Sequence, residues 1–178
     1  MLKKILIAPL LVVLVSTLAV GFQQGALWEK FNSPEGKFNI LMPAKPALEV
    51  RDVDSSLGKL TIYLYSTSNS SGYFLASYGD YPVGPKDANQ AESVLDGVRD
   101  GIQTGSKSEI VSEKKILLDS YPGREITTRK TDQGEVVVFK WRVYLVGRRL
   151  YENAVGTLQK DSESPDIMKF LTSFDLNK

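Results

Sequence analysis

The chain has 178 residues, and its 22 Lys and Arg residues nearly balance its 21 Asp and Glu residues, giving a formal net charge of +1. This balance argues against a nucleic-acid-binding protein and against adsorption of the folded domain to an anionic membrane, since both need a concentrated basic face. The chain has no cysteine and no histidine, which excludes disulfides, thiol nucleophiles, Ser-His-Asp triads and metal sites built on Cys or His. We therefore expect a non-enzymatic protein without a metal or other cofactor.

The N-terminal segment has the three-part pattern of a secretory signal. A cationic start at residues 1–4 is followed by the uncharged run 5–20, and Ala19 and Gly21 occupy small-residue positions before a cleavage point. We expect a signal peptide over residues 1–21. Its 16 uncharged residues are fewer than the roughly 20 of a spanning helix, but an uncleaved N-terminal anchor is the alternative and would then be the only membrane contact.

Both alternatives place the domain outside the cytoplasm, whether in a periplasm, secreted, or in the thylakoid lumen of a photosynthetic organism. Removing segment 1–21 takes away Lys3 and Lys4 and changes the net charge to about −1. The roughly 150 residues that remain are the size of one domain. We expect residues 22–32 to form a tether and residues 33–176 a single domain.

In the first half of the domain, short alternating segments predict strands. Apolar and polar residues alternate over 38–42 and 59–65, residues 48–53 are a further short strand candidate, and the turn 69–72 joins 59–65 to the returning strand 73–78 as a hairpin. Pro43 ends the first of these strands because it cannot donate to a ladder.

A helix is predicted over residues 87–104, with Asp87 or Asn89 as its N-cap and Gly105 as its stop. Gly97 and Gly101 weaken this helix by about 1 kcal/mol each relative to alanine, so packing must hold it in place. Apolar residues recur at one helical face; they are Ala91, Val94, Leu95, Val98 and Ile102.

The second half is predicted to be mostly sheet, with strands over 109–118, 124–130, 135–146 and 150–158 and a terminal helix over 165–174. Along 135–146 the side chains alternate, which predicts one dry and one partly wet face of the sheet. Phe139, Trp141, Val143 and Leu145 lie on the dry face, and Lys140, Arg142 and Tyr144 on the other. The fold class is therefore α+β, an antiparallel sheet flanked by helices.

Four short segments carry a resemblance to known proteins: Ser33–Pro43, Tyr121–Glu125, Arg142–Tyr151 and Phe170–Phe174. Together they resemble small exported bacterial proteins with the PsbP/Mog1-like α/β/α sandwich, over about residues 28–176. The resemblance implies an antiparallel sheet between helices. PsbP relatives are extrinsic lumenal proteins of photosystem II and Mog1 binds a small GTPase, so it also implies binding to a protein partner rather than catalysis. No residue here matches a PsbP metal ligand.

One group of residues is a candidate partner surface, a basic patch for an acidic protein. The alternative is a solvated sheet face whose cations pair with the chain's own carboxylates. The same face is expected to carry Tyr63, Tyr65, Tyr144 and Tyr151. If no other element covers this face, the combination of aromatic residues and arginine is typical of an interface. If the helix 91–102 covers it, the tyrosines belong to the core. The candidate partner residues are Arg124, Lys140, Arg142, Tyr144, Arg148 and Arg149.

Two further sets of charges are interpreted as structural. Arg124 and Glu125 are adjacent and are expected to pair across strands rather than to act as a functional pair. The carboxylates of Glu92, Asp96 and Asp100 are expected to lie on the wet side of the predicted helix. No catalytic residue is assigned.

The sequence thus predicts an exported, non-enzymatic accessory protein that binds a protein partner on the extracytoplasmic side of a membrane. The alternative is a carrier of a small apolar ligand or lipid, held between the sheet and the helix 87–104, whose glycines would permit loosening. The oligomeric state and the identity of the partner are left open.

Overall fold

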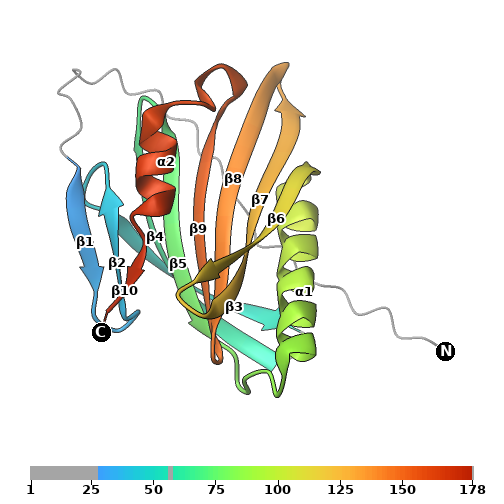
Figure 1. The fold of residues 1–178 in the computed structure, drawn as a ribbon. Coiled ribbons are helices and arrows are strands. Elements are labelled where there is room, and N and C mark those ends of the chain that lie inside the picture. Colours follow the sequence, from blue (N-terminus) through green and yellow to red (C-terminus); the bar gives the residue numbers. More distant parts are fainter. Residues whose placement is uncertain (1–27, 56–57, 178) are drawn as a thin grey trace.

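The computed structural model describes residues 28–55 and 58–177, so the predicted signal peptide and residues 22–27 of the predicted tether lie outside the described residues. Figure 1 shows a long twisted sheet with α1 on one face and, on the other, α2 beside a small second sheet. The elements are β1 (Glu29–Ser33), β2 (Phe38–Met42), β3 (Ala47–Ser55), β4 (Gly58–Asn69), β5 (Gly72–Asp80), α1 (Ala88–Ser106), β6 (Glu109–Leu118), β7 (Tyr121–Asp132), β8 (Glu135–Val146), β9 (Arg149–Leu158), the 3₁₀ turn η1 (Gln159–Asp161), α2 (Pro165–Thr172) and β10 (Asp175–Leu176).

Two antiparallel meanders meet in the middle of the large sheet. Within the described residues the strand order is β3-β4-β5-β9-β8-β7-β6, and the small sheet has the order β1-β2-β10. After β5, α1 carries the chain to the opposite edge, and β6 to β9 return strand by strand until β9 pairs with β5. β3 and β6 are therefore the outer strands of this sheet.

The first core lies between the sheet and α1. The predicted helix is confirmed: Asp87 is its N-cap, accepting a hydrogen bond from Gln90 N at 2.8 Å, and its predicted apolar face packs inward. The helix ends two residues beyond the predicted stop, at Lys107 in the left-handed conformation (φ 50°). The predicted dry face of β8 is also confirmed, with Phe139, Trp141, Val143 and Leu145 all buried in this core.

The second core covers the face that was expected to be partly wet. α2 and the small sheet pack on it, so Tyr144 and Tyr151 are only 4% and 2% exposed. The expectation that α1 would cover these tyrosines is wrong, since α1 packs on the opposite face. The assignment of residues 29–32 to a tether is corrected too, because they form most of β1 and pair with β2. Both faces of the sheet are thus occupied, one by a helix and one by a helix with strands.

Among the helices of residues 28–55 and 58–177, none combines the length and apolarity needed to cross a bilayer.

Alanine at Gly97 or Gly101 is expected to raise the free energy of unfolding by up to about 1 kcal/mol each, because helical glycine is costly relative to alanine. A Cβ at either position meets no atom within 4 Å. Urea denaturation measures the change. Gly123→Ala is the contrasting control: its Cβ would overlap the carbonyl oxygen of Val143 and the ring of Tyr144, so it should destabilise. A loss of stability at both helical positions would contradict the prediction.

Candidate functional site

The structure does not bring the six candidate partner residues into one surface patch. In a strand, successive side chains point to opposite faces, and Arg124 faces α1, as its contacts with that helix show. Arg148 is exposed in the connection between β8 and β9. The remaining four lie on the face that α2 and the small sheet cover; they are Lys140, Arg142, Tyr144 and Arg149.

Those four residues join the layers of the fold. Arg142 Nη2 lies 2.7 Å from Glu125 Oε2 on the neighbouring strand, and its Nη1 donates to the carbonyl oxygen of Leu171 on α2. Lys140 Nζ reaches Glu163, just before α2, at 3.0 Å. Tyr144 stacks on Phe174 with ring centroids 5.7 Å apart. These contacts occupy the side chains inside the protein.

Arg149 makes a bidentate ion pair with Asp80 on this face. Its Nε and Nη2 each donate at 2.7 Å to the two carboxylate oxygens of Asp80, a bidentate geometry that is among the stronger hydrogen-bonded pairs. These bonds hold the pKa of Asp80 below its usual value. The guanidinium of Arg149 also lies 4.8 Å from the ring centre of Tyr78, and its Nη1 donates to the carbonyl oxygen of Glu35. Arg149 therefore attaches the small sheet to the large one.

Arg124 is buried under α1, with 3% of its side chain exposed. Its Nη2 donates to Glu92 and, at 3.3 Å, to Asp96, and its Nε donates to Glu113 at 3.0 Å. The expected pairing across strands is confirmed: Arg124 binds Glu113 on β6, and Glu125, on the other face, binds Arg142 on β8. The expectation that Glu92 and Asp96 are merely solvated is corrected: they hold α1 to β7.

The charges of this cluster, which we call the Arg124 cluster, satisfy one another. Hydrogen bonds from Lys115 and then Arg124 lower the pKa of Glu92, and the bonds to carboxylates raise the pKa of Arg124 although burial alone lowers it. The cluster lines an open depression of about 450 Å³. Its lining carries as many cations as anions, so it offers no net charge to steer a charged partner. The lining residues are Glu92, Asp96, Arg99, Glu113, Lys115 and Arg124.

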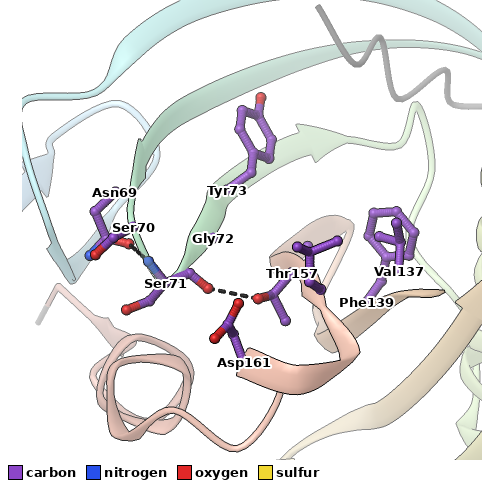
Figure 2. Close-up of a pocket in the computed structure, with 11 residues that line it drawn as sticks. Asn69, Ser70, Ser71, Gly72, Tyr73, Val137, Phe139, Thr157 and Asp161 are labelled. Atoms are coloured by element: carbon purple, nitrogen blue, oxygen red, sulfur yellow. Dashed lines mark hydrogen bonds between the residues drawn. The ribbon is translucent and has the colours of Figure 1, made fainter. Parts of the chain in front are cut away.

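A second hollow, which we call the end pocket, lies where the β4–β5 turn, the start of β8 and the end of β9 meet. Its volume is about 250 Å³, and its apolar walls are the side chains of Tyr73, Val137, Phe139 and Leu158. Figure 2 shows the turn residues on one side and the side chains of β8 on the other. The remaining lining residues are Asn69, Ser70, Ser71, Gly72, Gly156, Thr157 and Asp161.

Glycine at position 156 shapes the apolar wall. Gly156 pairs with Tyr73 on one side and with Phe139 on the other, so it stands between two aromatic residues on adjacent strands. A Cβ on Gly156 would approach the Phe139 ring to 2.9 Å. The missing side chain lets that ring lie against the backbone of β9, a close approach for which a strand glycine is suited.

The rim of the end pocket is polar, and hydrogen bonds join its turn residues to β9 and α2. Thr157 Oγ1 donates to the carbonyl oxygen of Ser71 at 2.7 Å, and Ser71 Oγ donates at 2.8 Å to Asp166 on α2. Figure 2 shows the Asp161 side chain directed toward Thr157 and the Ser71 turn. Within residues 28–55 and 58–177, the Asp161 carboxylate has no hydrogen-bond or ion-pair partner. The pocket thus combines an apolar wall with an unpaired anionic group at its edge.

The first core also contains a buried carboxyl group that the sequence analysis missed. Glu152 is 5% exposed and accepts a hydrogen bond from Ser77 Oγ at 3.2 Å. Burial raises the pKa of Glu152 to about 7, and the Ser77 bond offsets this only in part. Its place in β9 between Leu150 and Ala154, two inward-facing apolar residues, was the available signal. Since it is enclosed by the core, it cannot reach a substrate.

Neither these carboxylates nor any others form a metal site: in the described part of the chain, no group of three or more Asp or Glu side chains is placed to hold an ion.

Comparisons with known proteins agree with this architecture. No protein-family model matches the sequence, and no curated protein matches it. The structure is similar to that of cyanobacterial PsbP (CyanoP) from Synechocystis sp. PCC 6803, with a TM-score of 0.55, 13% identity, and coverage of 92% of this chain and 98% of that one. It is also similar to a Bacteroides thetaiotaomicron protein, with a TM-score of 0.50 and 13% identity.

The Bacteroides match covers 84% of this chain and 48% of the other, so the chain spans about half the length of that protein. At 13% identity these likenesses bear on the fold alone. The chain has a PsbP/Mog1-like fold, as the sequence resemblance implied.

Proposed function

We propose that this chain is a non-enzymatic binding protein that acts outside the cytoplasm and receives an apolar side chain of a protein partner in the end pocket. The observation that carries the proposal is an apolar cavity of about 250 Å³ with an unpaired carboxylate, Asp161, at its rim. The cationic and uncharged pattern of residues 1–21 supports the location. The absence of histidine and cysteine supports a role without catalysis.

A protein partner suits the dimensions of the end pocket better than a free ligand. Small-molecule sites commonly have volumes of about 300–1,000 Å³ and enclose most of their ligand, whereas this pocket is smaller. One aromatic or aliphatic side chain fits such a space, and interface energy is concentrated where such anchors enter pockets. Tyr73, 43% exposed, stands at its wall and is of the residue type enriched at these positions.

The rim favours a partner segment with a positive charge or a hydrogen-bond donor beside its apolar anchor. The Asp161 carboxylate then gains a partner, and the turn carbonyls and hydroxyls of Ser70 and Ser71 offer further acceptors. We do not assign this role to the predicted basic patch, because five of its six residues are engaged within the fold and only Arg148 is exposed. We therefore assign partner binding to the anionic rim of the end pocket rather than to the basic patch expected from the sequence.

The second candidate function, a carrier of a small apolar ligand, rests on the same apolar wall. Its position differs from the one expected, since side chains of the first core fill the space between the sheet and α1. Native mass spectrometry of protein purified from its source cells separates the two functions. A bound molecule in wild-type protein, lost in the pocket variant described next, supports the carrier; an empty protein supports the protein partner.

Filling the pocket is expected to abolish partner binding. Val137→Phe adds a ring to the pocket wall on β8, while Val111→Phe makes the same change at a side chain 53% exposed on β6. In affinity capture from source cells, wild type and Val111→Phe should recover the same partner, and Val137→Phe at least about ten-fold less, as expected from an anchor worth 1.4 kcal/mol or more. Equal recovery by Val137→Phe, with an unchanged thermal midpoint, would contradict the proposal.

A further inference from the structure

The outer edge of β3 is an open pairing site. β3 pairs with β4 along its whole length without a register shift, and none of the described strands pairs with its other side. Its nine residues include no proline, glycine or lysine. Leu48 and Val50 project from it with 55% and 51% exposure. A long, regular edge strand with exposed apolar side chains is a template for pairing with another chain, although β3 also carries the charged residues Glu49, Arg51, Asp52 and Asp54.

The opposite edge of the same sheet shows how such pairing is prevented. β6 contains Lys114 and Lys115, and its pairing with β7 is irregular between Ile110 and Ser112. Charged lysines and bulges are the features with which proteins block edge strands. β3 has no lysine and no irregularity in its pairing, and its charges are of both signs, so its open edge is less protected than that of β6.

The sequence of β3 is complementary to itself in one antiparallel register. When two copies are related by a two-fold axis through Val50, Glu49 of each copy lies opposite Arg51 of the other, and Val50 lies opposite Val50. Opposite charges and β-branched pairs stabilise neighbouring strands, and like charges directly opposite destabilise them. An axis through Glu49, Arg51 or Asp52 places like charges opposite each other.

The same two charges already pair within one chain. Arg51 Nη2 donates to Glu49 Oε2 at 2.8 Å along the face of the strand. In the two-fold register each arginine can exchange its own glutamate for that of the second copy, so association leaves neither charge unpaired. The pairing surface uses none of the residues that line the end pocket.

We propose that a second copy of this chain pairs with β3 in an antiparallel, two-fold arrangement centred on Val50, joining the two large sheets into one continuous sheet. Such an interface is isologous, the commonest kind in homodimers. It goes beyond the proposed function, since it assigns an oligomeric state and leaves the end pockets of both copies open to a partner.

The proposal is tested by reversing the charges of Glu49 and Arg51 and measuring the dimer dissociation constant by sedimentation equilibrium. Wild type should dimerise, and Glu49→Arg or Arg51→Glu alone should each raise the dimer dissociation constant about ten-fold or more, since each change puts like charges opposite at two symmetric positions. The double variant Glu49→Arg/Arg51→Glu restores opposite charges and should return the constant to within about three-fold of wild type.

The matched control is Val111→Lys on β6, which should leave dimerisation unchanged. A monomeric wild type overturns the proposal, as does a double variant no better than either single one. Loss of dimer in Val111→Lys also overturns it, because the interface then lies on the opposite edge. The three positions changed lie on the outer strands of the sheet, and equal thermal midpoints establish that the variants are folded. Capture of the protein partner through the end pocket is a separate measurement that these outcomes do not affect.

Discussion

Replacing Arg124 with methionine is expected to lower the free energy of unfolding by about 2–3 kcal/mol, below the roughly 3–5 kcal/mol of a fully buried pair, because its carboxylate partners are 27–48% exposed. Methionine fills much of the same space, so the loss comes from charge rather than from a cavity. Glu92, Asp96 and Glu113 would then lose the buried cation that they share, and only the more exposed Lys115 and Arg99 would still pair with them. Chemical denaturation measures the change, and α1 should lose amide protection first.

The matched control is Arg129→Met on the same strand. Arg129 is 47% exposed and pairs with Glu109, which is 62% exposed, and surface pairs of this kind contribute about 0–1 kcal/mol. Arg124→Met within 1 kcal/mol of this control would show that the Arg124 cluster does not hold α1 on the sheet.

Glu152→Gln is expected to stabilise the protein at pH 8 and to remove a fall in stability between about pH 4.5 and 7. Burial raises the pKa of Glu152 from 4.5 in the unfolded chain to about 7 in the folded one. Between these values the unfolded state has released the proton and the folded state keeps it, so stability falls as pH rises and levels off above pH 7. The shift corresponds to about 3 kcal/mol at most.

Thermal or urea denaturation at several pH values checks this prediction. The glutamine keeps a hydrogen-bonding group beside Ser77 but cannot ionise, so the variant's advantage over wild type should be small at pH 4.5 and largest at pH 8. Glu135→Gln, at an exposed position on β8, is the control and should leave the pH profile unchanged. A Glu152→Gln protein that is less stable than wild type at pH 8 would contradict the assignment of a costly buried charge.

Local patterns in the sequence were sufficient to predict the main elements. The alternation in β8 and the helical spacing in α1 each describe a single element with one strongly apolar face, which is the situation such patterns describe best. β1 was missed because its five residues carry little alternation, and it is held by β2 and by the ring of Phe31 against Tyr65. Such a strand forms because of its tertiary contacts, and its own sequence contains little signal for it.

The six candidate partner residues do not form one patch, for a related reason. Alternation places Lys140, Arg142 and Tyr144 on one face of β8 but does not say what covers that face. The cover comes from α2 and the small sheet, whose strands β1, β2 and β10 lie at the two ends of the domain. The sequence could have indicated that Arg124 faces the core, since it lies two residues from Ile126 on the same strand and so shares its face, and Ile126 is 1% exposed. Its three carboxylate partners, however, come from α1 and β6, and only the fold brings them together.

The end pocket had no signal in the sequence for the same reason. Its wall combines residues from 69–73, 137–139 and 156–161, which are distant along the chain and adjacent only after β5, β8 and β9 have paired. The absence of catalytic residue types was a reason to expect binding, but residues so far apart along the chain could not be recognised as one pocket from the sequence.

Hydrogen–deuterium exchange of the protein alone and in complex with its captured partner tests the central claim most directly, because it reports where the partner binds. Slower exchange in the complex confined to the segments 69–73 and 156–161 is the result that binding at the end pocket predicts. Unchanged exchange in these segments, with new protection over α1 or at the connection around Arg148, would contradict it and place the functional surface elsewhere.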